Sequence, residues 1–391
     1  MHPIVIIGSG MAGYTLAREF RKLNPDQALI MISADDAANY AKPTLSNALA
    51  ANKHPDQIAL ADAQKMSQQL NMQIMTHTTV TQIDAANHQI QLIKDGQQSN
   101  LDYAKLVLAL GASPIRLAFA GINQDEVPVV NSLHDYREFR QRIEQSQNKN
   151  IVILGAGLIG CEFANDLQHT GHQVDIVDLA PHALGRLMPS HVAEAFQEKL
   201  EQTGIRFHFK TTVEKMNKVE NGYQVHLSNG QILQSDLVLS AIGLQPNTQL
   251  AQNAQIKCNR GILTNPMLET NQQDIYALGD CVEVADLVLP YVMPLMQQAR
   301  ALAKTLNHQN TAIHYPAMPV AVKTPAAPLT VLPAPLNIEL DWQTESFEDG
   351  MLSKAIDTAG TLRAFVLLGA TAAKQRLALT KLVPDLVPVA E

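Results

Sequence analysis

The chain has 391 residues, of which 46% are hydrophobic and 17% charged, so we expect a soluble folded protein of roughly two or three domains. The formal net charge of -8 argues against nucleic acid or an anionic membrane as the main partner. The three cysteines, Cys161, Cys258 and Cys281, include no CxxC pair, and the 13 histidines lack metal-ligand spacing, so we expect no disulfide scaffold and no metal. No stretch approaches the ~18 apolar residues of a membrane-spanning helix, and a cytoplasmic location fits.

The N-terminal residues predict one βαβ unit. Residues 4–7 are an apolar run rich in β-branched side chains, which indicates a buried strand, and residues 14–20 have the apolar spacing of a helix. Gly8, Gly10 and Gly13 separate the two. A second apolar run at residues 29–32 is followed by Asp35, which completes a unit of about thirty residues.

The same pattern recurs later in the chain, so the sequence contains an internal repeat. A strand at residues 150–154 precedes Gly155, Gly157 and Gly160, a helix and a strand at 174–177, with Asp178 at its end. Alternating stretches around residues 80–96 and 223–230 predict a small antiparallel sheet in each half. Each leads into an apolar strand followed by glycine and proline, at 106–114 and 237–246.

The segment between residues 316 and 336 is rich in proline. Proline lacks the backbone N–H that a central strand needs, so we expect this stretch to stay out of central strand positions. Its start predicts a domain boundary near residue 315.

Each glycine set has the spacing G-x-G-x-x-G. The first glycine allows a tight turn, the second lets backbone amides approach a pyrophosphate, and the third lets the helix pack closely on the strand. One such motif alone also occurs as an ordinary turn. Here both motifs follow a strand and begin a helix. About twenty residues after each motif stands an acid that could bind ribose hydroxyls, Asp35 in the first case and Asp178 in the second. We therefore predict two dinucleotide sites.

The second acid also favours one nicotinamide cofactor over the other. A carboxylate at Asp178 would repel a 2′-phosphate by about 1 to 4 kcal/mol at a surface-like dielectric. The next arginine is only at Arg186, so no 2′-phosphate partner directly follows Asp178. We therefore expect NADH rather than NADPH.

Residues 270–280 (TNQQDIYALGD) resemble the second flavin motif of the FAD-dependent pyridine nucleotide reductases. Residues 241–247 (AIGLQPN) are similar to the segment that returns from the inserted NAD domain of that family. The resemblance covers almost the whole chain and implies FAD at the first site, with Asp280 on the ribityl or phosphate side. Within the family, residues 39–46 and 319–325 are most similar to members that reduce rubredoxin, and members that reduce flavorubredoxin are similarly patterned.

The resemblance also implies site residues. Lys42 and Glu162 would act beside the flavin and nicotinamide, and they could pair with each other. The alternative for Lys42 is an ordinary surface lysine. The alternative for Glu162 is an acid in the first turn of a helix, where the helix dipole favours it. Lys323, Val80 and Val292 match flavin-binding positions. The full set of predicted cofactor-binding residues is Gly8, Ser9, Gly10, Ala12, Gly13, Ser33, Ala34, Asp35, Lys42, Pro43, Val80, Gly111, Gly155, Gly157, Gly160, Glu162, Asp178, Gly243, Gly279, Asp280, Val292 and Lys323.

The absence of cysteine between residues 36 and 50 separates this chain from thiol and peroxide reductases of the family, which place redox cysteines there. Cys281 follows Asp280, but we expect it to be a packing residue. The resemblance then implies hydride transfer from NADH to FAD and release of single electrons to rubredoxin, through a transient, electrostatic contact at a basic patch, supplying for example an alkane hydroxylase. Alternatives are reduction of flavorubredoxin or a ferredoxin, and a non-catalytic flavoprotein that responds to NADH.

The predicted fold class is α/β, with two Rossmann-like dinucleotide-binding domains, one inserted in the other, and a small C-terminal α/β domain. We expect residues 1–114 and 241–315 to form the FAD-binding domain, residues 115–240 the NAD-binding domain, and residues 316–391 a C-terminal domain that covers the flavin.

Overall fold

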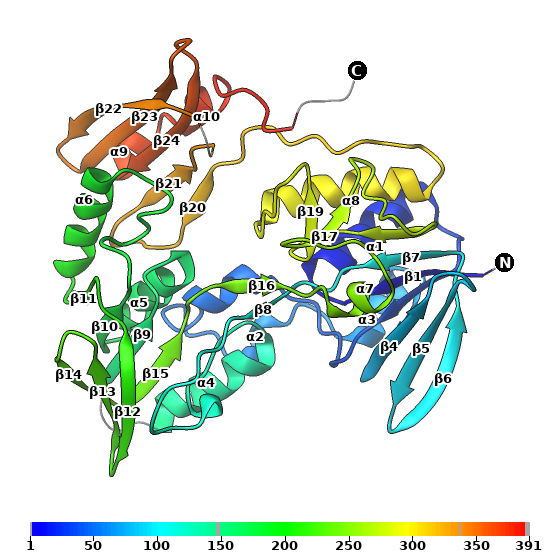
Figure 1. Cartoon of the computed structure of the whole chain (residues 1–391), viewed down its shortest axis with the longest axis horizontal. Helices are drawn as coiled ribbons and strands as arrows, with labels where there is room; N and C mark the ends of the chain where they lie inside the picture. The colour runs from blue at the N-terminus through cyan, green and yellow to red at the C-terminus, as the bar shows by residue number, and fades with distance from the viewer. Residues whose placement is uncertain (1, 146–148, 336–337, 388–391) are drawn as a thin grey trace.

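The computed structural model describes residues 2–145, 149–335 and 338–387. Figure 1 shows two α/β units beside each other, one built from the N-terminal residues and one from the middle of the chain, with the C-terminal sheet against the second. Residues 388–391 of the predicted C-terminal domain and residue 336 of the proline-rich stretch lie outside the described residues.

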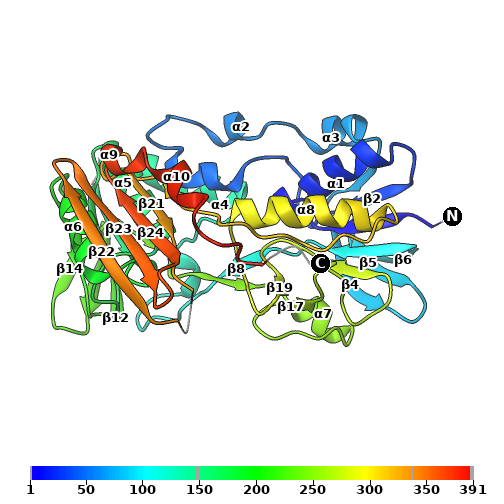
Figure 2. The same ribbon diagram turned by 90° about the horizontal axis from the view of Figure 1, so that it is seen from above.

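The first unit is built on a five-stranded parallel sheet. Its elements are β1 (Ile4–Ile7), α1 (Met11–Leu23), β2 (Leu29–Ile32), β3 (Gln73–Met75), β7 (Lys105–Leu108), β18 (Ile275–Ala277) and α8 (Val292–Leu306). β1 lies in the middle of the order β18-β7-β1-β2-β3, and its four residues are buried, as expected for a parallel strand covered on both faces. Helices α1 and α8 lie side by side over the sheet (Figure 2).

The second unit repeats this plan with a four-stranded parallel sheet in the order β11-β10-β9-β15. Its elements are α4 (Leu133–Gln145), β9 (Asn150–Leu154), α5 (Leu158–His169), β10 (Gln173–Val177), α6 (Ser190–Glu201), β11 (Arg206–His208) and β15 (Leu237–Ser240). In both units the strand before the glycines, β1 or β9, has a neighbouring strand on each side. The helix after the glycines connects it to one neighbour, and the other neighbour comes from a later part of the chain. Ligands bind at such switch points, outside the carboxyl ends of the strands.

Each unit also carries the predicted antiparallel sheet. The first contains β4 (Thr78–Asp84), β5 (Gln89–Lys94) and β6 (Gln97–Asp102), and the second contains β12 (Val213–Val219), β13 (Gly222–Leu227) and β14 (Ile232–Ser235). The turn between β5 and β6 has Asp95 and Gly96 at positive φ, the geometry of a two-residue hairpin. Two short strands, β8 (Ala112–Pro114) and β16 (Leu244–Pro246), pair where the chain crosses between the units.

The C-terminal sheet has five strands, all antiparallel, in the order β20-β21-β24-β23-β22. Its elements are β20 (Val320–Val322), β21 (Leu329–Leu332), β22 (Leu340–Phe347), β23 (Gly350–Asp357), β24 (Leu362–Leu368), α9 (Ala370–Ala373) and α10 (Arg376–Thr380). The expectation that the proline-rich stretch avoids central strands is wrong, because β21 pairs on both sides. The strands fit because Pro319, Pro325, Pro328 and Pro333 stand just outside them, so no strand N–H is missing.

The C-terminal sheet packs mainly on the second unit. Val322, Val331 and Val366 share one core cluster with Ile153 and Phe196 of that unit. The C-terminal domain also meets the first unit, where Val322 shares an apolar cluster with Leu45 and Ala48, and where Tyr315 pairs with Val387. That this domain covers the flavin stays a prediction.

The remaining short elements are η1 (Lys42–Asn47), α2 (Pro55–Ile58), α3 (Ala63–Gln69), η2 (Gln124–Glu126), α7 (Gln249–Asn253), β17 (Ile262–Thr264) and β19 (Val282–Val284). No helix within the described ranges is long and apolar enough to cross a membrane. The predicted α/β class, with its parallel sheets, is confirmed.

Candidate functional site

The first glycine loop connects β1 to α1 and is built as the motif requires. Gly8 has a φ of +116°, and a Cβ there would stand 2.2 Å from the carbonyl oxygen of Ala109. A Cβ on Gly13 would stand 2.0 Å from the carbonyl oxygen of Gly8, so only glycine lets α1 start this close to the strand. Gly10, by contrast, has no atom within 4 Å of the Cβ position and is exposed.

The second loop, between β9 and α5, has the same three environments. A Cβ on Gly155 would lie 2.6 Å from the oxygen of Ala241, and one on Gly160 would lie 1.9 Å from the oxygen of Gly155. Gly157 faces open space. Two open middle glycines at helix N-termini fit a pyrophosphate that approaches the backbone, because a side chain there would occupy the anion's place.

The acid of the first site, Asp35, is held by hydroxyl groups. Its Oδ1 accepts from Ser33 Oγ at 2.5 Å, from the Ala37 N–H at 2.9 Å and from Ser9 Oγ at 3.4 Å. Ser9 and Ser33 are buried, whereas Ala34 and Asp35 are exposed. All these bonds reach Oδ1, so they orient the exposed carboxylate through one of its two oxygens.

The acid of the second site, Asp178, accepts hydrogen bonds from backbone N–H groups with both of its carboxylate oxygens. Oδ2 accepts from the Ala156 N–H inside the glycine loop at 2.6 Å, and Oδ1 accepts from the Ala180 N–H at 2.7 Å. Asp178 therefore fixes the shape of the loop and also supplies negative charge at its rim.

The second flavin motif lies against the first glycine loop. Gly279 has a φ of +84°, and a Cβ there would come within 2.8 Å of Ala12 Cβ at the start of α1. Its N–H donates to Oε1 of Gln298, a buried residue of α8, at 2.6 Å. The sequence reasoning missed Gln298. The only hint was a polar residue on the apolar face of a helix.

Lys42 and Asp280 lie within electrostatic reach of each other. Burial lowers the pKa of Lys42, and the negative charge of Asp280 partly opposes this. Burial raises the pKa of Asp280, with Lys42 acting in the opposite direction. The fold therefore brings together two candidate site residues that are 238 positions apart in the printed numbering.

The pairing that we allowed between Glu162 and Lys42 is wrong. Glu162 Oε2 lies 2.5 Å from the ammonium of Lys323 and accepts from Ser46 Oγ at 2.6 Å, and Oε1 accepts from the Lys323 N–H at 3.0 Å. Lys323 comes from the C-terminal segment and forms the ion pair with Glu162, whereas the carboxylate that most raises the pKa of Lys42 is that of Asp280. Ser46, which is buried, was not among the predicted residues.

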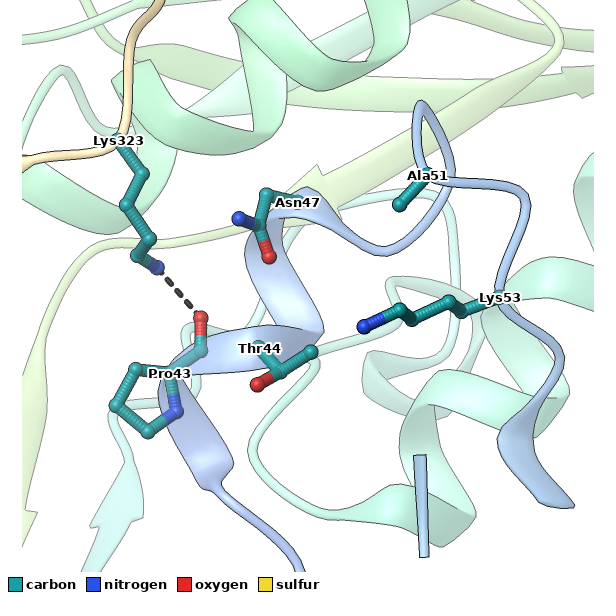
Figure 3. A pocket seen from close by; sticks show the side chains of 6 residues that line it. All are labelled: Pro43, Thr44, Asn47, Ala51, Lys53 and Lys323. Atoms are coloured by element: carbon teal, nitrogen blue, oxygen red, sulfur yellow. Dashed lines mark hydrogen bonds between the residues drawn. The ribbon is translucent and has the colours of Figure 1, made fainter. Parts of the chain in front are cut away.

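Figure 3 shows the cleft beside this network. It measures about 240 Å³ and is lined by Pro43, Thr44, Asn47, Ala51, Lys53 and Lys323. Lys323 enters from the C-terminal segment and donates to the carbonyl oxygen of Pro43 at 2.5 Å. The side chain of Lys53 approaches from the opposite side of η1.

Helix α5 accepts three further hydrogen bonds from its neighbours. Asp166, buried on that helix, accepts from the N–H groups of Leu49 and Ala50 at 3.0 Å each, and Asn165 accepts from the Ala326 N–H at 3.2 Å. Burial raises the pKa of Asp166 to about 6. Glu162, Asn165 and Asp166 thus join the first unit and the C-terminal segment to the second unit.

The other predicted residues lie around these groups. Gly111 and Gly243, at φ of +65° and +122°, precede the two crossing strands β8 and β16. Val292 is the first residue of α8 and is 39% exposed, and Val80 is half-buried on β4.

The three cysteines differ in exposure, and Cys258 is half-buried. Cys161 and Cys281 are buried, and burial raises the pKa of the Cys281 thiol to about 12. Within the described residues, all three cysteines are free, and no group of three or more His, Cys, Asp or Glu side chains could hold a metal ion.

Two family models match the chain, one over the two units with parallel sheets and one over the C-terminal sheet. Residues 2–304 match the model of the pyridine nucleotide-disulphide oxidoreductases, and residues 312–383 match a rubredoxin binding C-terminal domain.

Curated relatives match over nearly the whole length. The chain is 66% identical over 390 residues to a rubredoxin-NAD(+) reductase of Acinetobacter baylyi, covering 99% of each chain. It is 43% identical to a rubredoxin-NAD(+) reductase of Alcanivorax borkumensis, covering 99% of this chain and 100% of the relative. A nitric oxide reductase FlRd-NAD(+) reductase of Pectobacterium atrosepticum is 38% identical, covering 94% of this chain and 95% of the relative.

Solved structures agree on the fold. The putidaredoxin reductase–putidaredoxin complex matches with a TM-score of 0.87 at 22% identity, covering 98% of this chain and 94% of the other. NADH:rubredoxin oxidoreductase from Clostridium acetobutylicum matches with a TM-score of 0.80 at 22% identity, covering 98% and 96%. The family model, the full-length relatives and the paired glycine loops lead to one conclusion: the chain belongs to the pyridine nucleotide-disulphide oxidoreductase family.

Proposed function

We propose that this chain is an NADH-dependent rubredoxin reductase, which binds FAD at the first glycine loop and NADH at the second. The observation that carries the proposal is the 66% identity, over 99% of both chains, to a rubredoxin-NAD(+) reductase. The match of residues 312–383 to a rubredoxin binding domain supports the acceptor. Bound FAD would supply the change from two-electron to one-electron chemistry, taking hydride from NADH and giving up electrons singly.

The chain's own residues would bind and orient. The backbone around Gly10 would hold one pyrophosphate and that around Gly157 the other, each at a helix N-terminus. Asp35 would accept from a ribose hydroxyl through Oδ2, and Asp178 would disfavour a 2′-phosphate. No nucleophilic side chain is needed, because the chemistry depends on the placement of the two cofactors.

Two lysines would set the charge of the flavin site. Lys42 would keep a cation within electrostatic range of Asp280, which is half-buried. Glu162 would be held in one position by Lys323 and Ser46, on the side of α5 that faces η1. We propose that Lys42 and Glu162 are the two side chains closest to the reaction.

We propose the domain division expected from the sequence: residues 1–114 and 241–315 for FAD, 115–240 for NAD and 316–391 for the C-terminal domain. The separate parallel sheets and the β8–β16 crossing support it. We also infer a cytoplasmic location, since the cysteines of the described residues are free. Supply of electrons to an alkane hydroxylase is our proposal for the downstream use.

A second acceptor deserves a direct comparison, because one relative is a flavorubredoxin-type reductase at 38% identity. Stopped-flow mixing of the FAD-loaded, NADH-reduced chain with rubredoxin, flavorubredoxin or a ferredoxin would compare the carriers. We expect rubredoxin to be reduced fastest. Faster reduction of flavorubredoxin would change the named acceptor, and no turnover with any carrier would support a non-catalytic, NADH-responsive flavoprotein instead.

A further inference from the structure

The C-terminal domain is divided into an acidic part and a basic part. Residues 338–357, which form the hairpin of β22 and β23, contain six carboxylates and one lysine. Residues 358–384 contain Arg363, Lys374, Arg376 and Lys381 and no carboxylate. A chain with a net charge of -8 therefore concentrates positive charge around α9 and α10.

The same region exposes apolar side chains. Leu379 is only 6% exposed and anchors α10 in the small core of this domain, whereas Leu377 and Leu382 are 70% and 65% exposed. Isolated exposed leucines are common on protein surfaces. Here two lie within six residues, among three exposed basic side chains. We call Lys374, Arg376, Leu377, Lys381 and Leu382 the α10 surface.

The charges of the α10 surface are not neutralised by the chain itself. Within the described residues, none of its three basic side chains lies in a salt bridge. The other arginine of the segment, Arg363, pairs with Asp357 at 2.7 Å and is not part of this surface. An apolar centre with unpaired charge around it is the usual composition of a transient protein interface.

The position of the α10 surface fits a partner that must approach the first unit. In Figure 1, α10 lies on the side of the C-terminal sheet that faces α8, and β22 lies at the opposite edge. An acidic partner would be repelled by the β22 edge and attracted to α10, so the charge pattern would also orient it.

We propose that the α10 surface is the docking site of the one-electron carrier, which would present an acidic face to it, with Leu377 and Leu382 at the centre of the surface and Lys374, Arg376 and Lys381 around them. The proposal rests on the proposed function, because it specifies where that acceptor binds. The carrier would then contact the C-terminal domain at α10 and would not contact the edge strand β22.

The test compares charge reversals on and off this surface in the full-length, FAD-loaded enzyme. Lys374→Glu combined with Arg376→Glu removes the attraction, and Leu377→Ser removes part of the apolar centre. Lys94→Glu, on an exposed lysine at the end of β5, is the matched control. All positions are exposed, so folding should be retained. Each variant is assayed with NADH and purified rubredoxin over a salt series, and with menadione, a small uncharged acceptor.

We expect kcat/KM for rubredoxin to fall about tenfold or more at low salt in the double variant, with a flatter salt dependence, and several-fold in Leu377→Ser. Menadione reduction should not change. Rubredoxin rates within twofold of the Lys94→Glu control would overturn the docking site and leave the proposed function standing. If the unmodified enzyme reduced menadione but not rubredoxin, the proposed function itself would fail.

Discussion

Helices α1 and α5 begin with the same glycine motif but have different surroundings. On α1, the position two residues after the third glycine is Thr15, which is buried, and the later positions Arg18 and Glu19 are half-buried. On α5 the matching positions are Glu162, Asn165 and Asp166, all buried and all bonded to other parts of the chain.

The comparison teaches that the glycine motif determines where a dinucleotide binds but not what the following helix does. α1 packs against α8 within one apolar core. α5 instead uses its polar face to hold η1 and the C-terminal segment near the second glycine loop.

The largest effect is expected from filling the two open glycine positions. Gly10→Val and Gly157→Val each place a side chain where the pyrophosphate backbone contact is expected, and neither Cβ would clash with the protein. We expect Gly10→Val to purify without FAD. Gly157→Val should retain FAD, while its KM for NADH rises by about 100-fold or more.

Flavin absorbance and steady-state kinetics measure both effects. The reverse pattern, with FAD lost from Gly157→Val, would exchange the two site assignments. Equal loss of FAD from both variants would mean that the two loops are not independent sites.

The next effect concerns the ion pair that only α5 possesses. Lys323→Met leaves the carboxylate of Glu162, whose side chain is 6% exposed, without its cation. We expect a loss of about 3 kcal/mol in unfolding free energy, at the lower end for a buried pair because Lys323 is partly exposed. Thr15→Val on α1 should cost about 1 kcal/mol or less. Chemical denaturation of both FAD-loaded variants would compare them, and equal losses would contradict the special role of α5.

A third difference is the pH dependence of the α5 junction. The pKa of Asp166 is raised to about 6 in the folded chain, mainly by burial. A raised carboxyl pKa means that its stabilising contribution is present at low pH and is lost as pH rises through about 6. The stability of the unmodified chain relative to Asp166→Asn should therefore fall by about 3 kcal/mol between pH 4 and 7.

Thermal and denaturant unfolding of the two proteins over this pH range would give the difference. Glu19→Gln is the control on α1, because Glu19 forms only a surface pair with Lys22 and should show little change. A constant difference between the unmodified chain and Asp166→Asn would show that Asp166 does not titrate in this window.

The smallest effect is expected at the acids that end the second strands. Asp178→Asn removes the charge that repels a 2′-phosphate and keeps one acceptor for the loop. We expect the ratio of kcat/KM for NADPH to that for NADH to rise about tenfold. Asp35→Asn should weaken FAD retention and leave this ratio unchanged. An unchanged ratio in Asp178→Asn would remove that residue from cofactor selection.

Much of the fold could be predicted because the signals are local. The strands around the glycines, the hairpin at Asp95 and Gly96 and the repeat itself follow from spacing within about thirty residues. The proline rule failed at β21 because that strand is short enough to fit between Pro328 and Pro333.

The contacts between distant segments could not be predicted. Ser46, Glu162 and Lys323 are separated by more than 100 residues in the chain, and no spacing rule says which lysine reaches the glutamate. Gln298 was missed although Gly279 is only 19 residues away, because no spacing rule says that a glutamine side chain on a helix accepts from that backbone N–H. Which side chains meet at these positions depends on how the units pack against each other.

The most direct test of the central claim is the number of carriers reduced per NADH. The FAD-loaded chain is reduced anaerobically with one equivalent of NADH and then titrated with oxidised rubredoxin, followed by the flavin and iron absorbances. The account predicts two rubredoxins reduced per NADH, with the same result in Cys281→Ser. A flavin that stays reduced in the presence of rubredoxin, or turnover that is lost in Cys281→Ser while FAD remains bound, would contradict it.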